Sequence, residues 1–341
     1  MGNLRADAPR TVGAAVKAHV CTQLGLPNQL QFTEIDDPTP TPNQVLVSVK
    51  AAGVNFPDGL IVAGTYQTKP PLPFIPGSEV AGVVHSVGSD VQGVAPGKRV
   101  MAFCGMGGYA ELVAVTSDKV FVIPDSMSFS DAAGFVVTYG TSYHALVDRA
   151  AIQPGETLLV LGASGGVGLT AIEIGKALGA RVVAAASSEA KLEVCKQHGA
   201  DELINYTTGN LRERVAQVAP SGVDVVYDPV GGDHAATAVR ALSTAGRYLT
   251  VGYASGQIPK IGMNRLLVVG GALHGVLWGA WAKRNPECNA DNMRALFDMY
   301  DGGALSPHVN SIHQLINAPT ALEEVMSRRA LGKVILSTNP E

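Results

Sequence analysis

The sequence has few cysteines, little charge and no long apolar run, and each shortage excludes a class of protein. The four cysteines lie far apart and form no C-x-x-C pair, which excludes a zinc knuckle evident from sequence and fits a reducing compartment. Charged residues make up 16% of the chain and the net charge is −4, so no basic excess exists to neutralise nucleic-acid phosphates. The composition is that of a globular protein whose interior takes up much of the chain.

The absence of long apolar runs also bears on membranes and on targeting. The most hydrophobic segment, residues 266–282, is interrupted by glycines and is shorter than the roughly 20 residues that span a bilayer. We expect it to form a buried strand that continues into a loop. Residues 1–14 are expected to be a flexible extension, and no secretory signal is evident. We expect a cytoplasmic location, with mitochondrial targeting by the basic N-terminus as the alternative.

A chain of 341 residues is too long for one ordinary core and predicts two domains. The first part carries short runs of period-two character separated by Pro-rich turns, which predicts a β-rich domain. From about Asp131 strands alternate with helices, which predicts a parallel, doubly wound α/β sheet. Its strands are expected near residues 158–161, 182–185, 202–204, 223–227, 246–251 and 267–271. A last strand at 333–336 lacks a βαβ partner and should rejoin the first domain.

A glycine-rich turn carries the first functional prediction. It follows the apolar run 157–161 and opens the amphipathic segment 169–178, and a second strand at 181–185 comes after it. Glycines let a chain turn sharply and approach a ligand, and a helix N-terminus offers free N–H groups to a diphosphate. We therefore predict a dinucleotide site at Gly162, Ala163, Ser164, Gly165, Gly166 and Val167.

The end of the second strand indicates which nicotinamide cofactor binds. An NAD site usually places a carboxylate there, whereas this strand ends in Ser187 and Ser188, with Lys191 in the helix that follows. Hydroxyl groups and an ammonium suit a 2′-phosphate, so NADPH is predicted, with Tyr206 and Arg328 closing over the same phosphate. The alternative is that the serines only cap the helix and that Lys191 is a solvated surface charge.

Several spaced motifs resemble one known family. They are the segments 54–58, 64–66 and 73–82, the glycine-rich turn at 162–168, and the closing segment 328–334. In this order they resemble the medium-chain dehydrogenase/reductase superfamily, and within it the zinc-free quinone oxidoreductases of the zeta-crystallin type. The likeness runs from about Lys17 to Leu336.

The resemblance implies a fold and an assembly. It implies a GroES-like catalytic domain formed by residues 15–137 together with 290–341, a Rossmann domain at 138–289, and bound NADPH. It also implies a homodimer built by pairing of the Rossmann sheet edges. We expect the apolar segment 266–273 to be the final edge strand, which needs a cover against aggregation. The alternative is that a helix or the catalytic domain covers this strand within one chain.

The same resemblance predicts a metal-free reductase. Zinc-binding members place a cysteine ligand where Asn55 stands and a histidine ligand where Ser78 stands, and amides and hydroxyls are poor zinc ligands. Without a Lewis acid, quinones and α,β-unsaturated carbonyls are the expected acceptors. Tyr66 and Asn55 are the candidate catalytic residues, with a packing tyrosine and a turn-forming amide as the alternatives. Leu60 stands where many relatives carry a second tyrosine.

Further cofactor contacts follow from the resemblance, and two other functions remain open. The expected contacts are Asn55, Asp58, Thr138, Val230, Gly252, Tyr253, Ala254, Leu277, Trp278 and Gly279, of which Tyr253 and Trp278 could equally be core or interface aromatics. One alternative function is an enoyl-thioester reductase, for which Lys69, Lys283 and Arg284 would have to bind a CoA phosphate. The other is a non-catalytic NADPH-binding structural or RNA-binding protein.

Overall fold

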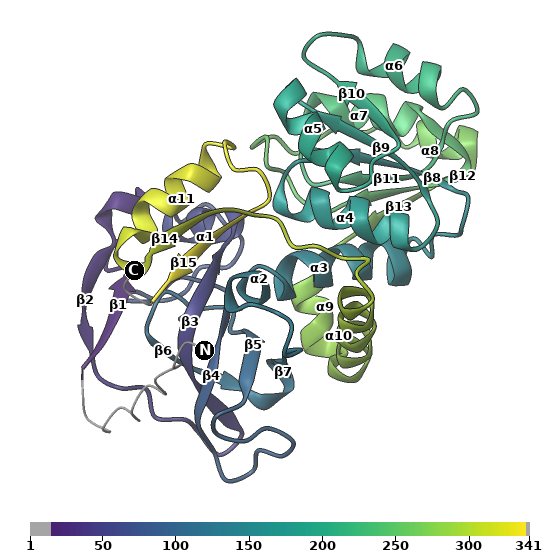
Figure 1. Ribbon diagram of the computed structural model, residues 1–341. Coiled ribbons are helices and arrows are strands. Elements are labelled where there is room, and N and C mark those ends of the chain that lie inside the picture. Colours follow the sequence, from purple (N-terminus) through teal and green to yellow (C-terminus); the bar gives the residue numbers. More distant parts are fainter. Residues whose placement is uncertain (1–14, 339–341) are drawn as a thin grey trace.

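The structure, a computed structural model, describes residues 15–338, which fold into two units (Figure 1). The extension expected at residues 1–14 lies outside the described residues. The first unit contains a two-stranded sheet and a seven-stranded sheet in the order β14-β15-β3-β4-β5-β7, with β6 paired to β3. Its strands are β1 (Val16–Val20), β2 (Gln31–Ile35), β3 (Gln44–Val54), β4 (Glu79–Val87), β5 (Arg99–Phe103), β6 (Leu112–Thr116), β7 (Val120–Val122), β14 (Val309–Gln314) and β15 (Lys333–Ser337).

Short helices join the strands of this first unit. They are η1 (Pro27–Gln29), α1 (Phe56–Val62), η2 (Ser117–Lys119), α2 (Phe129–Ala133), η4 (Leu315–Asn317) and α11 (Ala318–Met326). The chain returns to this unit at its end, where β15 pairs antiparallel with β3. The return of the last strand was predicted correctly. The prediction that this strand has no βαβ partner is wrong, because β14 lies parallel to β15 and α11 connects the two.

The second unit contains a six-stranded sheet that is parallel throughout, in the order β10-β9-β8-β11-β12-β13. Its strands are β8 (Thr157–Leu161), β9 (Arg181–Ala186), β10 (Glu202–Asn205), β11 (Val223–Asp228), β12 (Leu242–Thr250) and β13 (Ala272–Gly275). The helices are α3 (Val136–Tyr143), the π-helix η3 (His144–Arg149), α4 (Gly166–Ala177), α5 (Glu189–Gln197), α6 (Leu211–Val218), α7 (Asp233–Arg240), α8 (Asn264–Val269), α9 (Trp278–Arg284) and α10 (Pro286–Asp301). The doubly wound sheet is therefore confirmed.

The segment from 264 to 279 differs from what the sequence predicted. The expected strand at 267–271 is wrong, because Asn264–Val269 forms α8 and Gly270 ends that helix in the left-handed conformation, at φ 62°. The segment is not buried either, since Leu267 is 82% exposed and Val268 is 81% exposed. Residues 277–279 open α9 instead of forming a loop. Among residues 15–338, no helix is both long and apolar enough to cross a membrane.

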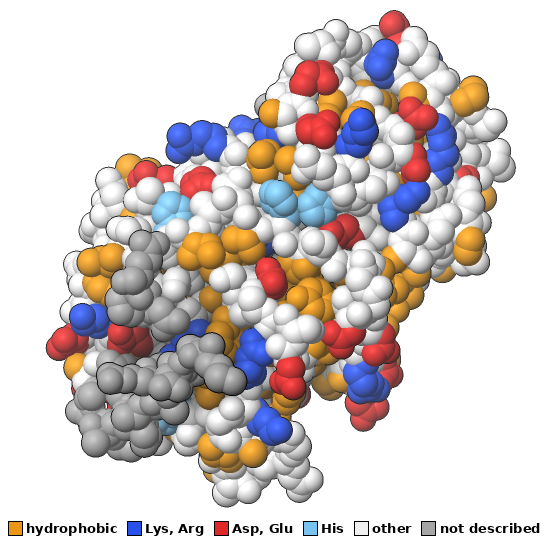
Figure 2. Space-filling view, in the orientation of Figure 1, with side chains coloured by type: hydrophobic (Ala, Val, Ile, Leu, Met, Phe, Trp, Pro, Cys, Tyr) orange, Lys and Arg blue, Asp and Glu red, His pale blue; other side chains and the backbone are white. Residues whose placement is uncertain are grey.

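The surface drawn in Figure 2 has no large patch of charged side chains of one sign. Basic and acidic side chains are interspersed there, as the small net charge predicts. Neither a basic stripe nor a basic groove for a phosphate backbone is visible on that side.

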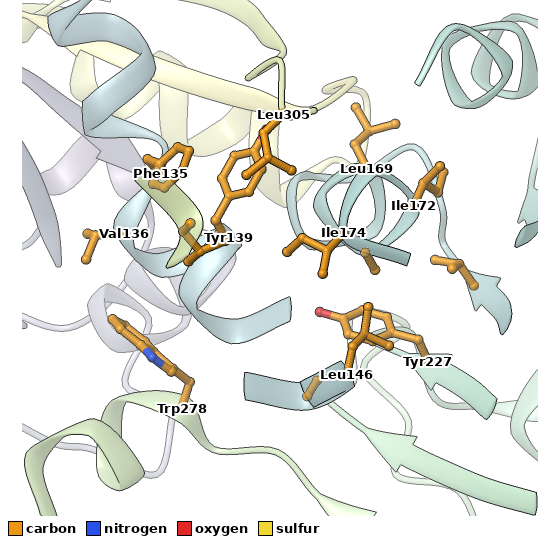
Figure 3. Close-up of a cluster of buried hydrophobic side chains, with 14 of the residues drawn as sticks. Phe135, Val136, Tyr139, Leu146, Leu169, Ile172, Ile174, Tyr227, Trp278 and Leu305 are labelled. Carbon is orange, nitrogen blue, oxygen red and sulfur yellow. The ribbon is translucent and has the colours of Figure 1, made fainter. Parts of the chain in front are cut away.

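One hydrophobic cluster joins the two units and lies around α3 and α4 (Figure 3). It includes Met101 of β5 and Leu158 of β8, so both sheets contribute to the same core. Phe135 and Tyr139 stack with ring centroids 4.1 Å apart, and the Tyr227 hydroxyl lies 2.9 Å from the Ser142 hydroxyl. A shared core holds the N-terminus of α4 at a fixed distance from the seven-stranded sheet, and the candidate site lies between them.

Candidate active site

The glycine-rich turn has the geometry that a diphosphate requires. Gly162 follows β8 with φ 56°, and a Cβ there would lie 2.6 Å from the Val230 side chain. A Cβ on Gly168 would lie 2.6 Å from two carbonyl oxygens of the turn. Gly165 is the N-cap of α4, and a Cβ on it would meet one atom, a carbonyl oxygen at 3.5 Å. The turn is therefore tight on its protein side and open at the N-terminus of α4.

A carboxylate that sequence reasoning missed shapes the loop beside this turn. Asp228 ends β11 and is buried, and it accepts hydrogen bonds from the backbone N–H groups of Val230 and Gly231 at 2.8 and 2.9 Å. It also accepts one from the Tyr248 hydroxyl. These bonds hold Val230 against Gly162. The available signal was a single carboxylate that ends an apolar strand directly before a Pro-Val-Gly-Gly turn.

Four of the residues expected to bind a 2′-phosphate lie together at the end of β9. The Lys191 ammonium donates to the Ser187 hydroxyl at 3.1 Å and to the carbonyl oxygen of Arg328 at 3.2 Å. Burial raises the pKa of Tyr206, while Ser187 and the Arg328 charge beside it lower that pKa. Ser188, by contrast, accepts from the Lys191 backbone N–H and caps α5. The capping alternative therefore describes Ser188, whereas Ser187, Lys191, Tyr206 and Arg328 converge.

Asn55 belongs to a buried polar network at the start of α1. Its Nδ2 donates to the Ser78 hydroxyl at 3.2 Å and to Glu79 Oε1 at 2.8 Å. Its Oδ1 accepts from the Lys333 ammonium at 2.9 Å. That ammonium also donates to Glu79 at 2.7 Å and to the carbonyl oxygen of Val54 at 3.1 Å. Both hydrogens of the Asn55 amide are therefore already bonded within the protein, and sequence reasoning missed Glu79 and Lys333.

Asp58 lies beside this network and is completely enclosed. Its carboxylate accepts from the backbone N–H of Asn55 at 2.9 Å and from the Tyr109 hydroxyl at 3.1 Å. Burial raises the pKa of Asp58 to about 6, and its hydrogen bonds and the Lys333 charge partly oppose that shift. The structure therefore makes Asp58 an internal partner of the α1 N-terminus.

Tyr66 follows α1 and is half-buried against the core of the catalytic domain. Its backbone N–H donates to the carbonyl oxygen of Leu60 at 3.2 Å, so the end of α1 fixes its position. Burial raises the pKa of the Tyr66 phenol, and the Gln67 side chain opposes that shift. The phenol is therefore neutral at physiological pH and has a proton to donate.

Two further predicted contacts lie around the turn. Thr138 on α3 is buried, and a Cβ on Gly166 would lie 3.2 Å from its methyl group, so Thr138 adjoins the start of α4. Its hydroxyl donates to the carbonyl oxygen of Gly134 at 2.6 Å. The segment Gly252, Tyr253 and Ala254 lies over the loop after β11, where the Tyr253 ring lies beside Gly231.

Trp278 lies in the core and not on the surface of a loop. It is 4% exposed, its Nε1 donates to Asn289 Oδ1 at 3.1 Å, and its ring meets Phe103 edge-on at 5.0 Å. Gly279 also adjoins Phe103, whereas Leu277 is 52% exposed. Of the alternatives for Trp278, the structure shows the core aromatic.

Comparison of the sequence with known proteins identifies the family of this chain. The alcohol dehydrogenase GroES-like domain family matches residues 41–125, and the zinc-binding dehydrogenase family matches residues 166–294. Quinone oxidoreductase-like protein 2 of Rattus norvegicus is 37% identical over 323 residues, which cover 94% of this chain and 92% of that protein. The chain belongs to the quinone oxidoreductase branch of the medium-chain dehydrogenase/reductase superfamily. It is therefore an oxidoreductase.

Solved structures of this family share the whole fold. Escherichia coli quinone oxidoreductase complexed with NADPH aligns with a TM-score of 0.86 at 29% identity, covering 95% of this chain and 99% of that one. A probable oxidoreductase from Mycobacterium abscessus aligns with a TM-score of 0.87 at 36% identity, with coverage of 95% and 99%. The GroES-like domain and the Rossmann sheet that the resemblance implied are confirmed.

Proposed function

We propose that this oxidoreductase is a zinc-independent NADPH:quinone reductase. The observation that carries the proposal is the polar cluster at the end of β9, where the Lys191 ammonium lies 3.1 Å from the Ser187 hydroxyl and adjoins Arg328. Glu189, the carboxylate nearest in sequence, accepts from the Asn205 side chain at 2.8 Å. A site with one ammonium, one guanidinium and hydroxyl groups suits a 2′-phosphate better than a ribose hydroxyl.

The donor set at the former zinc positions supports the zinc-independent part of the proposal. Asn55 donates to Ser78 there, and the Lys333 ammonium already lies within hydrogen-bond distance of Asn55 and Glu79. A zinc ion needs thiolate, imidazole or carboxylate ligands that point at one centre, and an ammonium at that centre repels it. Within residues 15–338, no group of three or more His, Cys, Asp or Glu side chains could hold a metal ion. The residues present do not fit zinc.

The mechanism then depends on positioning and on charge stabilisation. NADPH would supply the hydride when bound, and the open N-terminus of α4 at Gly165 would hold its diphosphate. Reduction of a quinone places negative charge on an oxygen atom, and the neutral phenol of Tyr66 is the candidate hydrogen-bond donor to it. Asn55 acts by ordering the start of α1, because its amide hydrogens are bonded to Ser78 and Glu79.

The enoyl-thioester alternative finds less support. Lys69 lies in the loop after α1, whereas Lys283 and Arg284 end α9, and all three are exposed. Lys69 and the two residues of α9 lie on different elements, and no observed contact supports a shared phosphate site.

We also propose a homodimer. The edge strand β13 and helix α8 lie in a stretch with large exposed apolar side chains, and monomeric proteins rarely leave such a stretch uncovered. The exposed side chains are Ile258, Met263, Leu267, Val268, Leu273 and Leu277.

A panel of acceptors tests the proposed function. Purified protein should oxidise NADPH faster than NADH with simple quinones, and kcat/KM for quinones should exceed that for enoyl thioesters. Activity should survive dialysis against a chelator, and elemental analysis should find no stoichiometric zinc. Higher kcat/KM with enoyl thioesters would favour the alternative, and activity that zinc restores after chelation would refute the zinc-independent mechanism.

A further inference from the structure

Gly332 and Lys333, at the start of β15, connect the glycine-rich turn to the buried polar network around Asn55. Gly332 has φ 77°, and a Cβ on it would lie 2.4 Å from the carbonyl oxygen of His308. Only glycine fits this turn without strain. The turn directs the next residue, Lys333, into the protein, where it is 7% exposed.

The stem of Lys333 lies against the cofactor turn. A Cβ on Gly166 would lie 3.3 Å from Lys333 Cδ, and a Cβ on Gly134 would lie 3.0 Å from Lys333 Cγ. The Gly332 backbone N–H donates to the carbonyl oxygen of Ser164 at 2.9 Å, and Gly332 forms a parallel bridge with the glycine that follows Ser164. The stem therefore lies between the N-terminus of α4 and the end of α2.

The head of Lys333 reaches the catalytic domain. Its ammonium has three acceptors, namely Glu79 Oε1, Asn55 Oδ1 and the carbonyl oxygen of Val54, at 2.7, 2.9 and 3.1 Å. Three acceptors satisfy all its N–H groups, so it has no proton to offer a substrate. The bond to Oδ1 fixes which way the Asn55 amide faces, because its Nδ2 must then point at Glu79 and Ser78.

We propose that Lys333 is a positioning residue that couples the diphosphate-binding turn to the start of α1. It provides a tethered cation at the residues where zinc-binding relatives would hold their metal. This inference rests on the proposed function for its kinetic readout. Order that a bound cofactor would impose on the turn would pass through the stem of Lys333 to Asn55, whose amide orders the start of α1.

The decisive variant removes the ammonium without leaving a buried charge. Lys333→Met alone keeps the stem but leaves the buried Glu79 carboxylate without its ammonium partner, which destabilises the fold. Lys333→Met combined with Glu79→Gln is neutral. Glu79 also accepts from the Val137 backbone N–H, so the new Gln oxygen should face that group and its NH₂ should face Asn55. The Asn55 amide must then turn round.

Lys176→Met, which removes an exposed ammonium bonded to Asp201, is the matched control.

Kinetics with a simple quinone separate positioning from a purely structural role. The double variant should melt near the wild-type temperature and bind NADPH within about threefold of wild type, while kcat falls about tenfold or more and KM changes little. Lys176→Met should match wild type in all four quantities. Wild-type kcat in the double variant would overturn the proposal, because Lys333 would then only neutralise Glu79. Parallel loss of melting temperature and NADPH binding would overturn it as well.

Hydrogen exchange tests the coupling without any turnover. The probe is 2′-phospho-ADP-ribose, which carries the diphosphate and the 2′-phosphate but no nicotinamide. In wild type it should slow exchange in the turn at 162–168 and also in α1, whereas in the double variant it should protect the turn alone. Protection confined to the turn in wild type would refute the coupling. A wild type that reduces no quinone but shows the coupled protection would refute the proposed function and leave this inference standing.

Discussion

At the scale of single residues, the Lys333 ammonium interacts with two buried carboxyl groups, those of Glu79 and Asp58. Lys333 bonds directly to Glu79, while Asp58 feels its charge without a direct bond and has backbone and phenol donors instead. Desolvation therefore dominates at Asp58, and its pKa rises from 3.8 to about 6. The folded protein holds a proton on this carboxyl more tightly than the unfolded chain does.

This difference predicts a pH dependence of stability. The contribution of Asp58 is fully present below the unfolded pKa of 3.8 and is lost as the pH rises through about 6. Between pH 5 and pH 7, wild type should lose about 1 kcal/mol of unfolding free energy relative to Asp58→Asn, as measured by urea titration. The exposed Asp125→Asn substitution should leave the profile unchanged. Parallel profiles for wild type and Asp58→Asn would contradict the assignment.

Lys191 provides the second test at this scale. Lys191→Ala should weaken NADPH binding by about 1–3 kcal/mol, the range of a charge-assisted hydrogen bond, and leave NADH nearly unchanged. Fluorescence titration of both cofactors measures the difference. Lys196→Ala, on an exposed part of the same helix, is the control. Equal losses for the two cofactors would show that Lys191 does not contact the phosphate.

At the scale of elements, the turn between β8 and α4 contains glycines with different duties. Gly162 has φ 56° and its missing Cβ leaves room for Val230, so its role lies in the fold. Gly165 has an ordinary φ of −79° and faces open space, so its role lies in the approach of a ligand. Substitution of Gly162 should therefore affect stability, whereas substitution of Gly165 should affect ligand binding.

Alanine substitutions measure that separation. Gly162→Ala should lower the unfolding free energy by about 1–2 kcal/mol or more, from the left-handed backbone and from contact with Val230. Gly165→Ala should unfold like wild type but bind NADPH more weakly, because its methyl group takes up space meant for the diphosphate. Thermal melts and cofactor titrations of both variants provide the data. A Gly165→Ala protein with wild-type affinity would mean that the diphosphate does not lie there.

Sequence patterns predicted the elements whose period is clear and missed those whose pattern is short or polar. β8, β9 and β11 are largely apolar runs, and helices separate the strands from β8 to β12, so alternation of strand and helix identified them. The apolar run in α8 is too short for its pattern to distinguish a helix from a strand. In the structure it is a helix that ends at Gly270, which adopts the left-handed conformation. β14 was missed because four of its six residues are polar.

The candidate site shows the same limit more strongly. The turn and the end of β9 follow from local spacing, because strand ends and helix starts are local features. The bond between Glu79 and Lys333 joins residues 254 apart in sequence, and no local pattern indicates it. Asn55 was singled out by position, but its partners became known only once β15 was placed beside β3.

At the scale of the whole molecule, the exposed apolar residues around α8 and β13 predict the assembly. Leu267→Asp combined with Val268→Asp changes two side chains that are 82% and 81% exposed, so the fold should survive while dimerisation fails. Sedimentation should show a wild-type dimer and a monomeric variant. Leu26→Asp, exposed on the catalytic domain, should remain a dimer. Wild type that sediments as a monomer across the micromolar range would rule the dimer out.

The place of β15 also sets an order of events during protein synthesis. This strand lies between β14 and β3, so the first sheet to be translated keeps a gap until residues 333–337 leave the ribosome. The Rossmann strands are all translated before that point and have their neighbours earlier. We therefore expect a nascent chain to complete the six-stranded sheet before the seven-stranded one. Because Lys333 begins the closing strand, we expect a chain that stops short of it to complete the six-stranded sheet but to lack the polar network around Asn55 and Glu79.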